Sequence, residues 1–422
     1  IDLSQKNLGS ADVTLLAAWV QRPNVIASLT SCCLLHNPLG EGVNEIIKVF
    51  EQTPRLRTLC GFEEGIEKID WSNSGKGVVD VALLSADLAA GRATASVTTL
   101  VLDEGELSGT KIMDKGEPYE ELEQLDADLS GFEALCLALA SSQIITLSLK
   151  KCYLGPQAIA LLADATSKMA SIVTINISQS KIGVEGGQAI VEALKTTTLE
   201  SIVIGNDLTL QLKGELESDS FDASGQSIDP GYAMIMAWWL TTPVTASIAS
   251  LSLKGNFPCG RISRDNDGSA PWLPGKELEG WTALCAGLAT SKTITHLDVS
   301  NCLLDSEPVA LLADAIKLMA AVKVINLSGC PLTGATMNEY GEWKNIDSDM
   351  TGFIALCGVL GKLHEINLSG CQLGPTSAAE LGKAISSAGG SLTKVVITGA
   401  KISETDVATL RAAAPNGCEV VW

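Results

Sequence analysis

One sequence motif recurs in register along most of this chain of 422 residues and constrains its fold more than any other feature. The motif is L-x-x-L-x-L-x-x-(N/C)-x-L, in which Ile and Val often replace Leu. One copy runs from Ile144 to Leu154 in QIITLSLKKCYLG. Further copies begin at Leu29, Ile248, Ile294, Val322, Leu363 and Leu392. A unit repeated in series predicts a stack of small supersecondary structures that bury one continuous core.

Each copy of the motif predicts the same local structure. The L-x-L alternation points one set of side chains into a core and the other to the opposite face of a strand. The Asn or Cys that follows lies where the chain turns, so its side chain can bond backbone groups of the neighbouring turn and form a ladder. The stretch after the turn, such as GPQAIALLADATSKM at 155–169, is apolar at helical spacing.

The repeat length narrows this prediction. The ladder positions Cys152 and Ser180 are 28 residues apart, as are Cys302 and Cys330. A unit of this length with a full helix resembles the ribonuclease-inhibitor-like class of leucine-rich repeats. The resemblance implies an α/β leucine-rich-repeat solenoid of about 12–14 repeats, a horseshoe with a parallel concave sheet and convex helices. It also implies a scaffold rather than one particular activity.

A second, longer period shows that part of the chain is duplicated. Positions 74, 105, 152 and 180 recur at 226, 256, 302 and 330, about 150 residues later. Residues 1–29 align without gaps with residues 69–97. We therefore predict a partial N-terminal block (1–68), a block with an inserted loop (69–220) and a duplicated block with two inserted loops (221–422). Because residue 1 starts inside a repeat strand, we expect residues to precede Ile1 in the natural gene product.

Two intervals are too short for the helical half of the repeat. Only ten positions separate the strand starts Leu59 and Ile69, and DLTLQLKGELESDS at 207–220 fills a similar interval before Phe221. Each interval predicts a connection made of strands alone, such as a hairpin.

Three insertions occur at one point of the repeat, after the ladder turn and before a helix that begins GFEALC, GWTALC or GFIALC. They span 110–130, 261–279 and 335–351, so all three should emerge from one rim of the horseshoe. They carry charged residues and large apolar or aromatic ones, although only 4% of the chain is aromatic. These residues are either anchors for a protein partner or packing that fixes the loops to the scaffold. The candidate binding residues are Met113, Tyr119, Arg261, Arg264, Trp272, Tyr340 and Trp343.

The concave face of the sheet is the second candidate surface. Its predicted outward positions are mostly small and polar, as at Asp298, Asn326 and Asn367, with a basic spot at Lys150, Lys151 and Lys254. Such a face could accept a peptide or a helix, but it lacks the aromatic anchors of tight interfaces.

Composition limits the partners and the compartment. The formal net charge is −20, which opposes binding to nucleic acid and favours a basic protein partner. No run of 18 apolar residues predicts a membrane span. The 12 cysteines follow the repeat rather than a disulfide framework, so we expect reduced thiols and an intracellular, cytoplasmic protein, or an organellar one if a leader precedes Ile1.

The sequence offers little catalytic chemistry. His36, His296 and His364 occupy unrelated positions and lack the spacing of metal ligands. Cys136, Cys285 and Cys357 recur with the scaffold, as a catalytic thiol would not. The segment DNDGS at 265–269 resembles part of a calcium loop but places Pro274 where a bidentate Glu is needed. We therefore expect no catalytic residue, no metal and no cofactor.

These observations favour a non-catalytic scaffold that binds a protein partner through the rim loops, the concave face or both. Two alternatives stay open. Some repeat proteins of this class activate small GTPases, and Arg261 and Arg264 are the rim arginines that suggest such a role. The third possibility is a structural subunit of a larger assembly.

Overall fold

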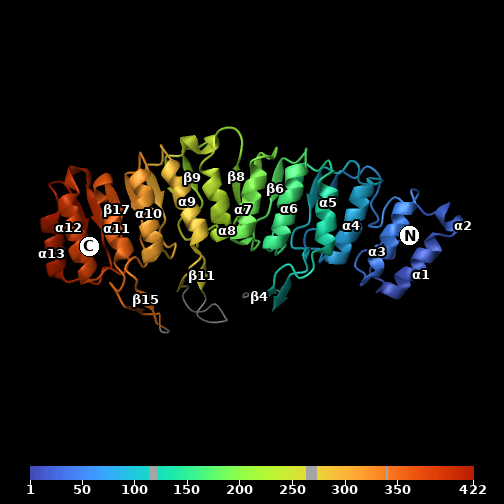
Figure 1. Cartoon of the computed structure of the whole chain (residues 1–422), viewed down its shortest axis with the longest axis horizontal. Helices are drawn as coiled ribbons and strands as arrows, with labels where there is room; N and C mark the ends of the chain where they lie inside the picture. The colour runs from blue at the N-terminus through green and yellow to red at the C-terminus, as the bar shows by residue number, and fades with distance from the viewer. Residues whose placement is uncertain (114–120, 263–272, 339–340) are drawn as a thin grey trace. The chain divides into compact units, whose positions relative to one another are not determined.

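The computed structural model describes residues 1–113, 121–262, 273–338 and 341–422. The chain divides into two compact units, Ile1–Leu210 and Gln211–Trp422, and each is described by itself (Figure 1). The three-block division at 68/69 and 220/221 rests on the internal sequence relationship and stays a prediction.

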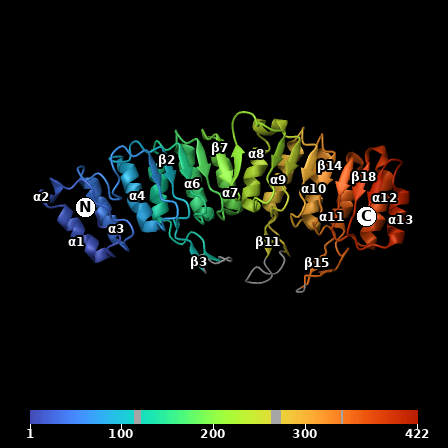
Figure 2. The same cartoon turned by 180° about the vertical axis from the view of Figure 1, so that it is seen from behind.

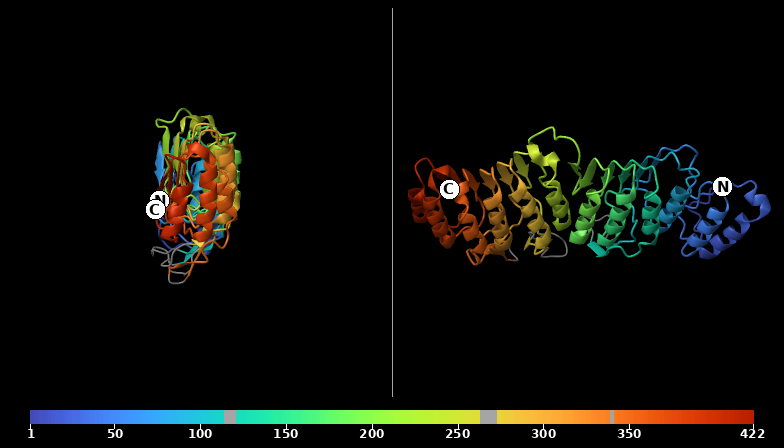
Figure 3. Two further views of the ribbon diagram at one scale, coloured as in Figure 1. Left: turned by 90° about the vertical axis from the view of Figure 1, so that its left-hand side faces the viewer. Right: turned by 45° about the horizontal axis from the view of Figure 1, so that its top comes forward.

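The first unit contains a six-stranded sheet with helices along one face (Figures 1 and 3). Its strands lie in the order β1 (Lys68–Asp70), β2 (Thr99–Val101), β5 (Thr146–Ser148), β6 (Thr174–Asn176), β7 (Ser201–Ile204) and β8 (Leu208–Gln211). From β1 to β7 every pairing is parallel. The helices are α1 (Ser10–Val20), α2 (Pro23–Ile26), α3 (Gly42–Gln52), α4 (Val78–Ala90), α5 (Ser130–Leu139), α6 (Pro156–Lys168) and α7 (Gly183–Leu194).

The second unit repeats this arrangement with seven parallel strands. They are β9 (Ser220–Asp222), β10 (Ser250–Ser252), β13 (His296–Asp298), β14 (Val324–Asn326), β17 (Glu365–Asn367), β18 (Lys394–Val396) and β19 (Glu419–Val421). The helices are α8 (Pro230–Trp239), α9 (Leu278–Thr290), α10 (Ser306–Leu318), α11 (Thr351–Cys357), α12 (Pro375–Ser387) and α13 (Glu404–Ala413), with short 3₁₀ turns η1 (Pro243–Ser247), η2 (Leu360–Lys362) and η3 (Gly389–Ser391).

The core of each unit follows the predicted alternation along the strands. In the first unit the middle residues Ile69, Leu100, Leu147, Ile175 and Ile202 pair in register and are buried. Their neighbours on either side in the strands face the opposite, open side of the sheet. The repeated apolar positions therefore build one continuous core against the helices.

The predicted ladder is present at the turns after the strands. The Asn37 side chain donates to the Leu3 carbonyl at 2.8 Å, and Asn256 donates to the Ala223 carbonyl at 2.7 Å. At the cysteine positions a thiol donates to a carbonyl of the preceding turn over 3.1–3.4 Å. These residues are Cys152, Cys302, Cys330 and Cys371. One polar side chain in each such turn thus satisfies backbone of its neighbour.

Both short intervals lack a helix, as predicted. Strands β7 and β8 are hydrogen-bonded neighbours joined by only three residues, which makes them a hairpin. The described residues 59–67 contain no helix or strand, so the connection made of strands that was predicted there is wrong. There the buried Asp87 carboxylate of α4 accepts hydrogen bonds from Leu59 N at 2.7 Å, Cys60 N at 3.0 Å and Thr58 Oγ1 at 2.5 Å. A side chain of the next repeat therefore binds backbone that has no helix or strand to pair with.

Close packing against a preceding helix explains why glycine begins the helix starts GFEALC, GWTALC and GFIALC. A Cβ atom at Gly280 would lie 2.2 Å from the Pro230 carbonyl oxygen of the preceding helix. A Cβ atom at Gly352 would lie 1.8 Å from the Ser306 carbonyl oxygen, and one at Gly131 would lie 2.2 Å from the Val78 carbonyl oxygen. Because backbone cannot move as a flexible side chain can, these helices approach this closely only with glycine.

We predict that Gly280→Ala destabilises the second unit by about 1–3 kcal/mol, because the added methyl group must displace the backbone of α8. The matched control is Gly382→Ala in α12, where the nearest atom to an added Cβ is Leu410 Cδ2 at 3.5 Å. That control should instead gain about 0.5–1 kcal/mol from helix propensity. Urea unfolding followed by circular dichroism measures both changes, and equal stability of the two variants would contradict the packing argument.

Candidate functional site

All three insertions form β-hairpins, a structure that the sequence did not predict for them. Their strands are β3 (Lys111–Met113) with β4 (Glu121–Gln124), β11 (Arg261–Ile262) with β12 (Leu273–Pro274), and β15 (Thr336–Met337) with β16 (Trp343–Lys344). Each leaves the scaffold after a ladder turn and returns just before α5, α9 or α11, as expected from the sequence. In the second unit both hairpins leave from the same edge (Figures 1 and 2).

Buried threonine hydroxyls anchor the first and third hairpins at their bases. Thr110 Oγ1 donates to the Tyr153 carbonyl at 2.8 Å, and Thr333 Oγ1 donates to the Gln372 carbonyl at 3.1 Å. Both carbonyls belong to the ladder turn of the next repeat. Each base is therefore bonded to the repeat that follows it.

A carboxylate at the end of each of these hairpins caps a helix of the next repeat. Asp126 accepts three hydrogen bonds of 2.9–3.0 Å at the start of α6, from the amides of Gly155, Gln157 and Ala158. Asp347 accepts the corresponding bonds at the start of α12, from the amides of Gly374, Thr376 and Ser377. Helix α6 and helix α12 both have glycine at the N-cap, which has no side chain to accept these bonds.

The second hairpin is also connected to a helix start of the next repeat, but through a basic residue instead of an acidic one. Helix α10 has its own acidic N-cap residue, Asp305, and the ammonium of Lys276 at the hairpin's end forms an ion pair with it. All three hairpins are thus joined to a helix start of the next repeat. This connection makes their stems part of the scaffold rather than loose loops.

The structure describes only part of the predicted binding set on these hairpins. Met113 is the last residue of β3, and Trp343 is half-buried on β16. The Arg261 guanidinium lies over the Phe257 ring at 4.4 Å, and burial lowers its pKa. Tyr119, Arg264, Trp272 and Tyr340 lie outside the described residues, as does the DNDGS segment at 265–269.

On the open face of the sheets, two of the three predicted basic residues face carboxylates. Lys150 Nζ lies 2.5 Å from Asp207 Oδ2, and Lys151 Nζ lies 3.9 Å from Glu104 Oε2. Lys254 belongs to the second unit and is exposed. The positive charge at Lys150 and Lys151 is therefore compensated within the first unit.

The small polar residues of this face bond their own backbone. Asp298, Asn326 and Asn367 each accept a hydrogen bond of 2.8–3.1 Å from the amide two residues later. The same turn follows β1, where Lys68 and Ser72 lower the pKa of Asp70 to about 2. These side chains stabilise the ends of the strands, and that use reduces what they can offer to a ligand.

A buried polar cluster in the first unit was not predicted. The ammonium of Lys76 contacts His36 Nε2 and lies 5.2 Å from the centre of the Trp71 ring, while the His36 amide donates to Asp80 Oδ1 at 2.7 Å. Burial lowers the pKa of Lys76. His36 and Lys76 are 40 residues apart and share no motif, so only the fold brings them together.

The buried cysteine thiols are suited to packing and not to nucleophilic chemistry. Burial raises the pKa of the Cys136 and Cys259 thiols to about 12 and that of Cys330 to about 11, so these thiols stay protonated near neutral pH. Within the described part of the chain, no group of three or more His, Cys, Asp or Glu side chains could hold a metal ion. No described helix has the length and apolar character needed to cross a membrane.

Parallel strands, one helix in most repeats and an Asn/Cys ladder at the turns together define the architecture. The chain has the leucine-rich-repeat fold. Among solved structures it is similar to the leucine-rich repeat-containing protein LegL7 from Legionella pneumophila, at 15% identity and a TM-score of 0.27, over 87% of this chain and 93% of that one. It is also similar to TLR13 in a complex with ssRNA13, at 12% identity and a TM-score of 0.26, over 94% of this chain and 50% of that one. A scan of protein-family models and a search of curated proteins find no match.

We predict that Asp126→Ala weakens the start of α6 by about 1 kcal/mol, because three amides lose their acceptor. The expected result is faster hydrogen exchange in the first turn of α6 and a lower urea midpoint. Asp164→Ala in the same helix is the matched control, since this exposed carboxylate pairs only with Lys168 one turn away. It should change stability by less than about 0.5 kcal/mol. Equal effects of the two substitutions would refute the capping role.

Proposed function

We propose that this protein is a non-catalytic scaffold that binds a partner protein through its three inserted hairpins. The observation that carries the proposal is the attachment of every hairpin to a helix start of the next repeat. Binding residues act best on supports that hold their position, because less ordering entropy is lost on association. Between their paired strands the sequences of the same insertions include Tyr119, Trp272 and Tyr340, residue types that often dominate binding energy.

The open face of the sheets is the less favoured surface for this role. Its polar side chains already bond the scaffold's own backbone, and Lys150 and Lys151 face carboxylates. A partner would have to break these contacts or bind without them.

The charge of the chain indicates the kind of partner. A formal net charge of −20 favours a protein with a basic surface and disfavours nucleic acid. Thiols that act as ladder donors must be reduced, and this supports an intracellular location. The repeat length and the full helices support assignment to the ribonuclease-inhibitor-like class.

Activation of a GTPase is the alternative that Arg261 and Arg264 suggested. Stacking on Phe257 gives Arg261 a packing role, and this contact favours the scaffold over the regulator. A role as a structural subunit would also use the hairpins as contact points. It differs from the scaffold only in the permanence of the complex.

We predict that Tyr119→Ala/Trp272→Ala/Tyr340→Ala weakens partner binding about 30-fold or more, as expected when hot-spot residues worth about 2 kcal/mol or more are removed. The partner is first captured from a native extract with the full chain. Its affinity for purified variants is then measured by biolayer interferometry, with GTP hydrolysis assayed in parallel if the partner is a GTPase.

Two controls make this experiment decisive. Leu137→Ala/Leu318→Ala removes exposed apolar side chains from α5 and α10 and should leave affinity unchanged. Lys150→Ala/Lys254→Ala tests the open face of the sheets. Loss of binding in this lysine variant with full binding in the hairpin variant would overturn the proposal.

A further inference from the structure

A lysine replaces a core leucine at one position of the first unit. In other copies of the repeat the last position of the motif, two residues after the ladder, is a buried leucine: Leu39, Leu154, Leu304, Leu332 and Leu373. After ladder position 74 it is Lys76, which is only 6% exposed. Burial of an ammonium group costs free energy unless a polar partner compensates it, so the surroundings of Lys76 decide what this exception can do.

This exception to the repeat lies beside the short interval 59–67, which contains no helix or strand. Trp71 stands at another leucine position of the same repeat, and its ring stacks on that of Phe62 in the interval with 6.2 Å between the ring centres. The Lys76 ammonium lies 5.2 Å from the centre of the Trp71 ring. Trp71 and Lys76 therefore pack together where the preceding repeat has no helix of its own.

The hydrogen-bonding partner of Lys76 comes from the other side of this interval. The ammonium contacts His36 Nε2, and within the described ranges of the chain no carboxylate lies at ion-pair distance from Lys76. An imidazole nitrogen accepts a hydrogen bond only when it carries no proton. The contact therefore requires His36 in its neutral form.

The same turn makes a second bond across the interval. The His36 amide donates to Asp80 Oδ1 at 2.7 Å, and Asp80 lies in the first turn of α4. The contacts of His36 with Lys76 and Asp80 together form what we call the His36 junction. This junction connects a turn of the N-terminal repeats to the repeat that begins at Ile69.

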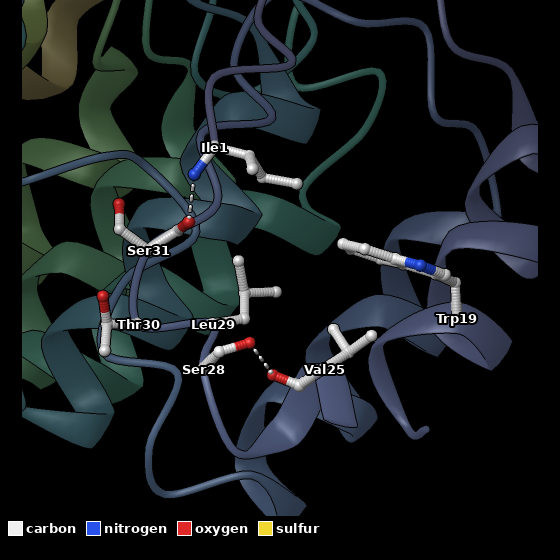
Figure 4. Close-up of a pocket in the computed structure, with 7 residues that line it drawn as sticks. All are labelled: Ile1, Trp19, Val25, Ser28, Leu29, Thr30 and Ser31. Atoms are coloured by element: carbon white, nitrogen blue, oxygen red, sulfur yellow. Dashed lines mark hydrogen bonds between the residues drawn. The ribbon is translucent and has the colours of Figure 1, made fainter. Parts of the chain in front are cut away.

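Backbone pairing places the His36 turn within the N-terminal residues 1–58. Figure 4 shows Ser31, whose carbonyl accepts a hydrogen bond from the Ile1 amino group at 2.7 Å. On the other side of this strand the Leu34 amide donates to the Leu59 carbonyl at 2.9 Å. The His36 junction therefore adds side-chain contacts to the backbone pairing that joins residues 1–58 to the rest of the first unit.

A second proton on His36 would change the charge balance of the junction. Both ring nitrogens would then be donors, so Nε2 could no longer accept from Lys76. Two cations would lie in contact, with the carboxylate of Asp80 as the nearby opposite charge. The contact between His36 and Lys76 is therefore incompatible with protonation of His36.

Other ionisable groups around the junction keep their charge in mild acid. His36 is the single histidine of the first unit, and imidazole is the side chain that ordinarily changes charge between about pH 5 and about pH 8. Burial raises the pKa of the Cys33 and Cys60 thiols, and acid only adds protons to Lys76. The remaining charged residues of the adjoining turns and of α3 are Lys6, Glu41, Glu45, Glu104 and Glu106, whose groups ordinarily titrate outside this range.

We propose that the His36 junction is a pH-sensitive contact that closes at neutral pH and opens in mild acid. Protonation of His36 separates it from Lys76 and loosens residues 1–58 from the repeat that begins at Ile69. The junction is separate from the hairpins and does not depend on their proposed role.

Hydrogen exchange at the amide of residue 36 reports the junction directly, because this amide bonds Asp80. It is measured on the full chain by mass spectrometry with electron-transfer fragmentation, at about pH 7.5 and about pH 5.5, and corrected for the intrinsic rate at each pH. We expect protection to fall about tenfold at the lower pH, as uptake of one proton by an imidazole on opening implies. The buried amide of Ile175 in β6 should keep its protection.

Two variants test the two halves of the contact. His36→Gln is the matched control, since glutamine accepts the same hydrogen bond without titrating, and Gln179 has the same left-handed backbone at this point of the repeat (φ 59°). Lys76→Leu restores the residue of the other copies and removes the second cation. Protection at residue 36 should be independent of pH in both variants.

Three results would overturn the proposal. The first is equal protection of the parent chain at the two pH values. The second is the same tenfold fall in His36→Gln, which would assign the titration to another group. The third is the same fall in Lys76→Leu, which would show that the charge of Lys76 is not the cause.

Discussion

The hydrogen bond from a side chain of one repeat to the backbone of its neighbour is the interaction on which this structure depends. A stack of short strands and turns leaves backbone groups at every turn that no regular ladder can pair. Cys302 and Asn256 satisfy such groups within the regular repeats. Asp126 accepts hydrogen bonds from backbone amides at a helix start, and Asp87 accepts them from a segment without a helix. Each unit is therefore held together by contacts between adjacent repeats, as expected for a solenoid.

Around the interval that lacks a helix, charged side chains of the following repeat supply hydrogen bonds to the backbone. The interval 59–67 has no helix, and Arg92 binds the backbone just ahead of it. Its guanidinium donates to the carbonyls of Phe50, Thr53 and Leu56 over 2.7–3.0 Å and lies above the Phe50 ring. Three carbonyls at the end of α3 and in the turn after it thereby bond one side chain of a later repeat.

Much of this fold could be predicted from the sequence, because it follows from periodicity. The strands around Leu147, the ladder at Cys152 and the point of insertion after each ladder turn all derive from one repeated pattern. The contacts between blocks could not be predicted, since residues such as Lys76 and His36 have no fixed spacing in the repeat. The hairpin strands were also missed. Arg261–Ile262 and Thr336–Met337 are two-residue strands among polar residues, too short to show alternation.

For the candidate site, too, some features could be predicted from the sequence and others could not. Trp343 and Arg261 were identified by residue type, and the structure adds that Arg261 stacks on Phe257. The attachment of hairpins to the next repeat was invisible in the sequence, because Asp126 and Asp347 are ordinary acidic residues until the fold places them at a helix start. The bases of the first and third insertions are bonded to the repeat that follows them, and loops held on a rigid scaffold are where binding residues are often found.

Hydrogen exchange at Leu59 and Cys60 tests most directly the claim that side chains of the next repeat secure unpaired backbone. In Asp87→Ala the Leu59 amide loses its acceptor, and the Cys60 amide keeps only Thr58 Oγ1 at 3.1 Å. Leu59 should exchange about 30-fold faster, equivalent to about 2 kcal/mol for a bond to a charged acceptor, and Cys60 should change less, while the amides of β6 and β7 keep their rates. Unchanged exchange at Leu59, or the same acceleration throughout the first unit, would contradict the account.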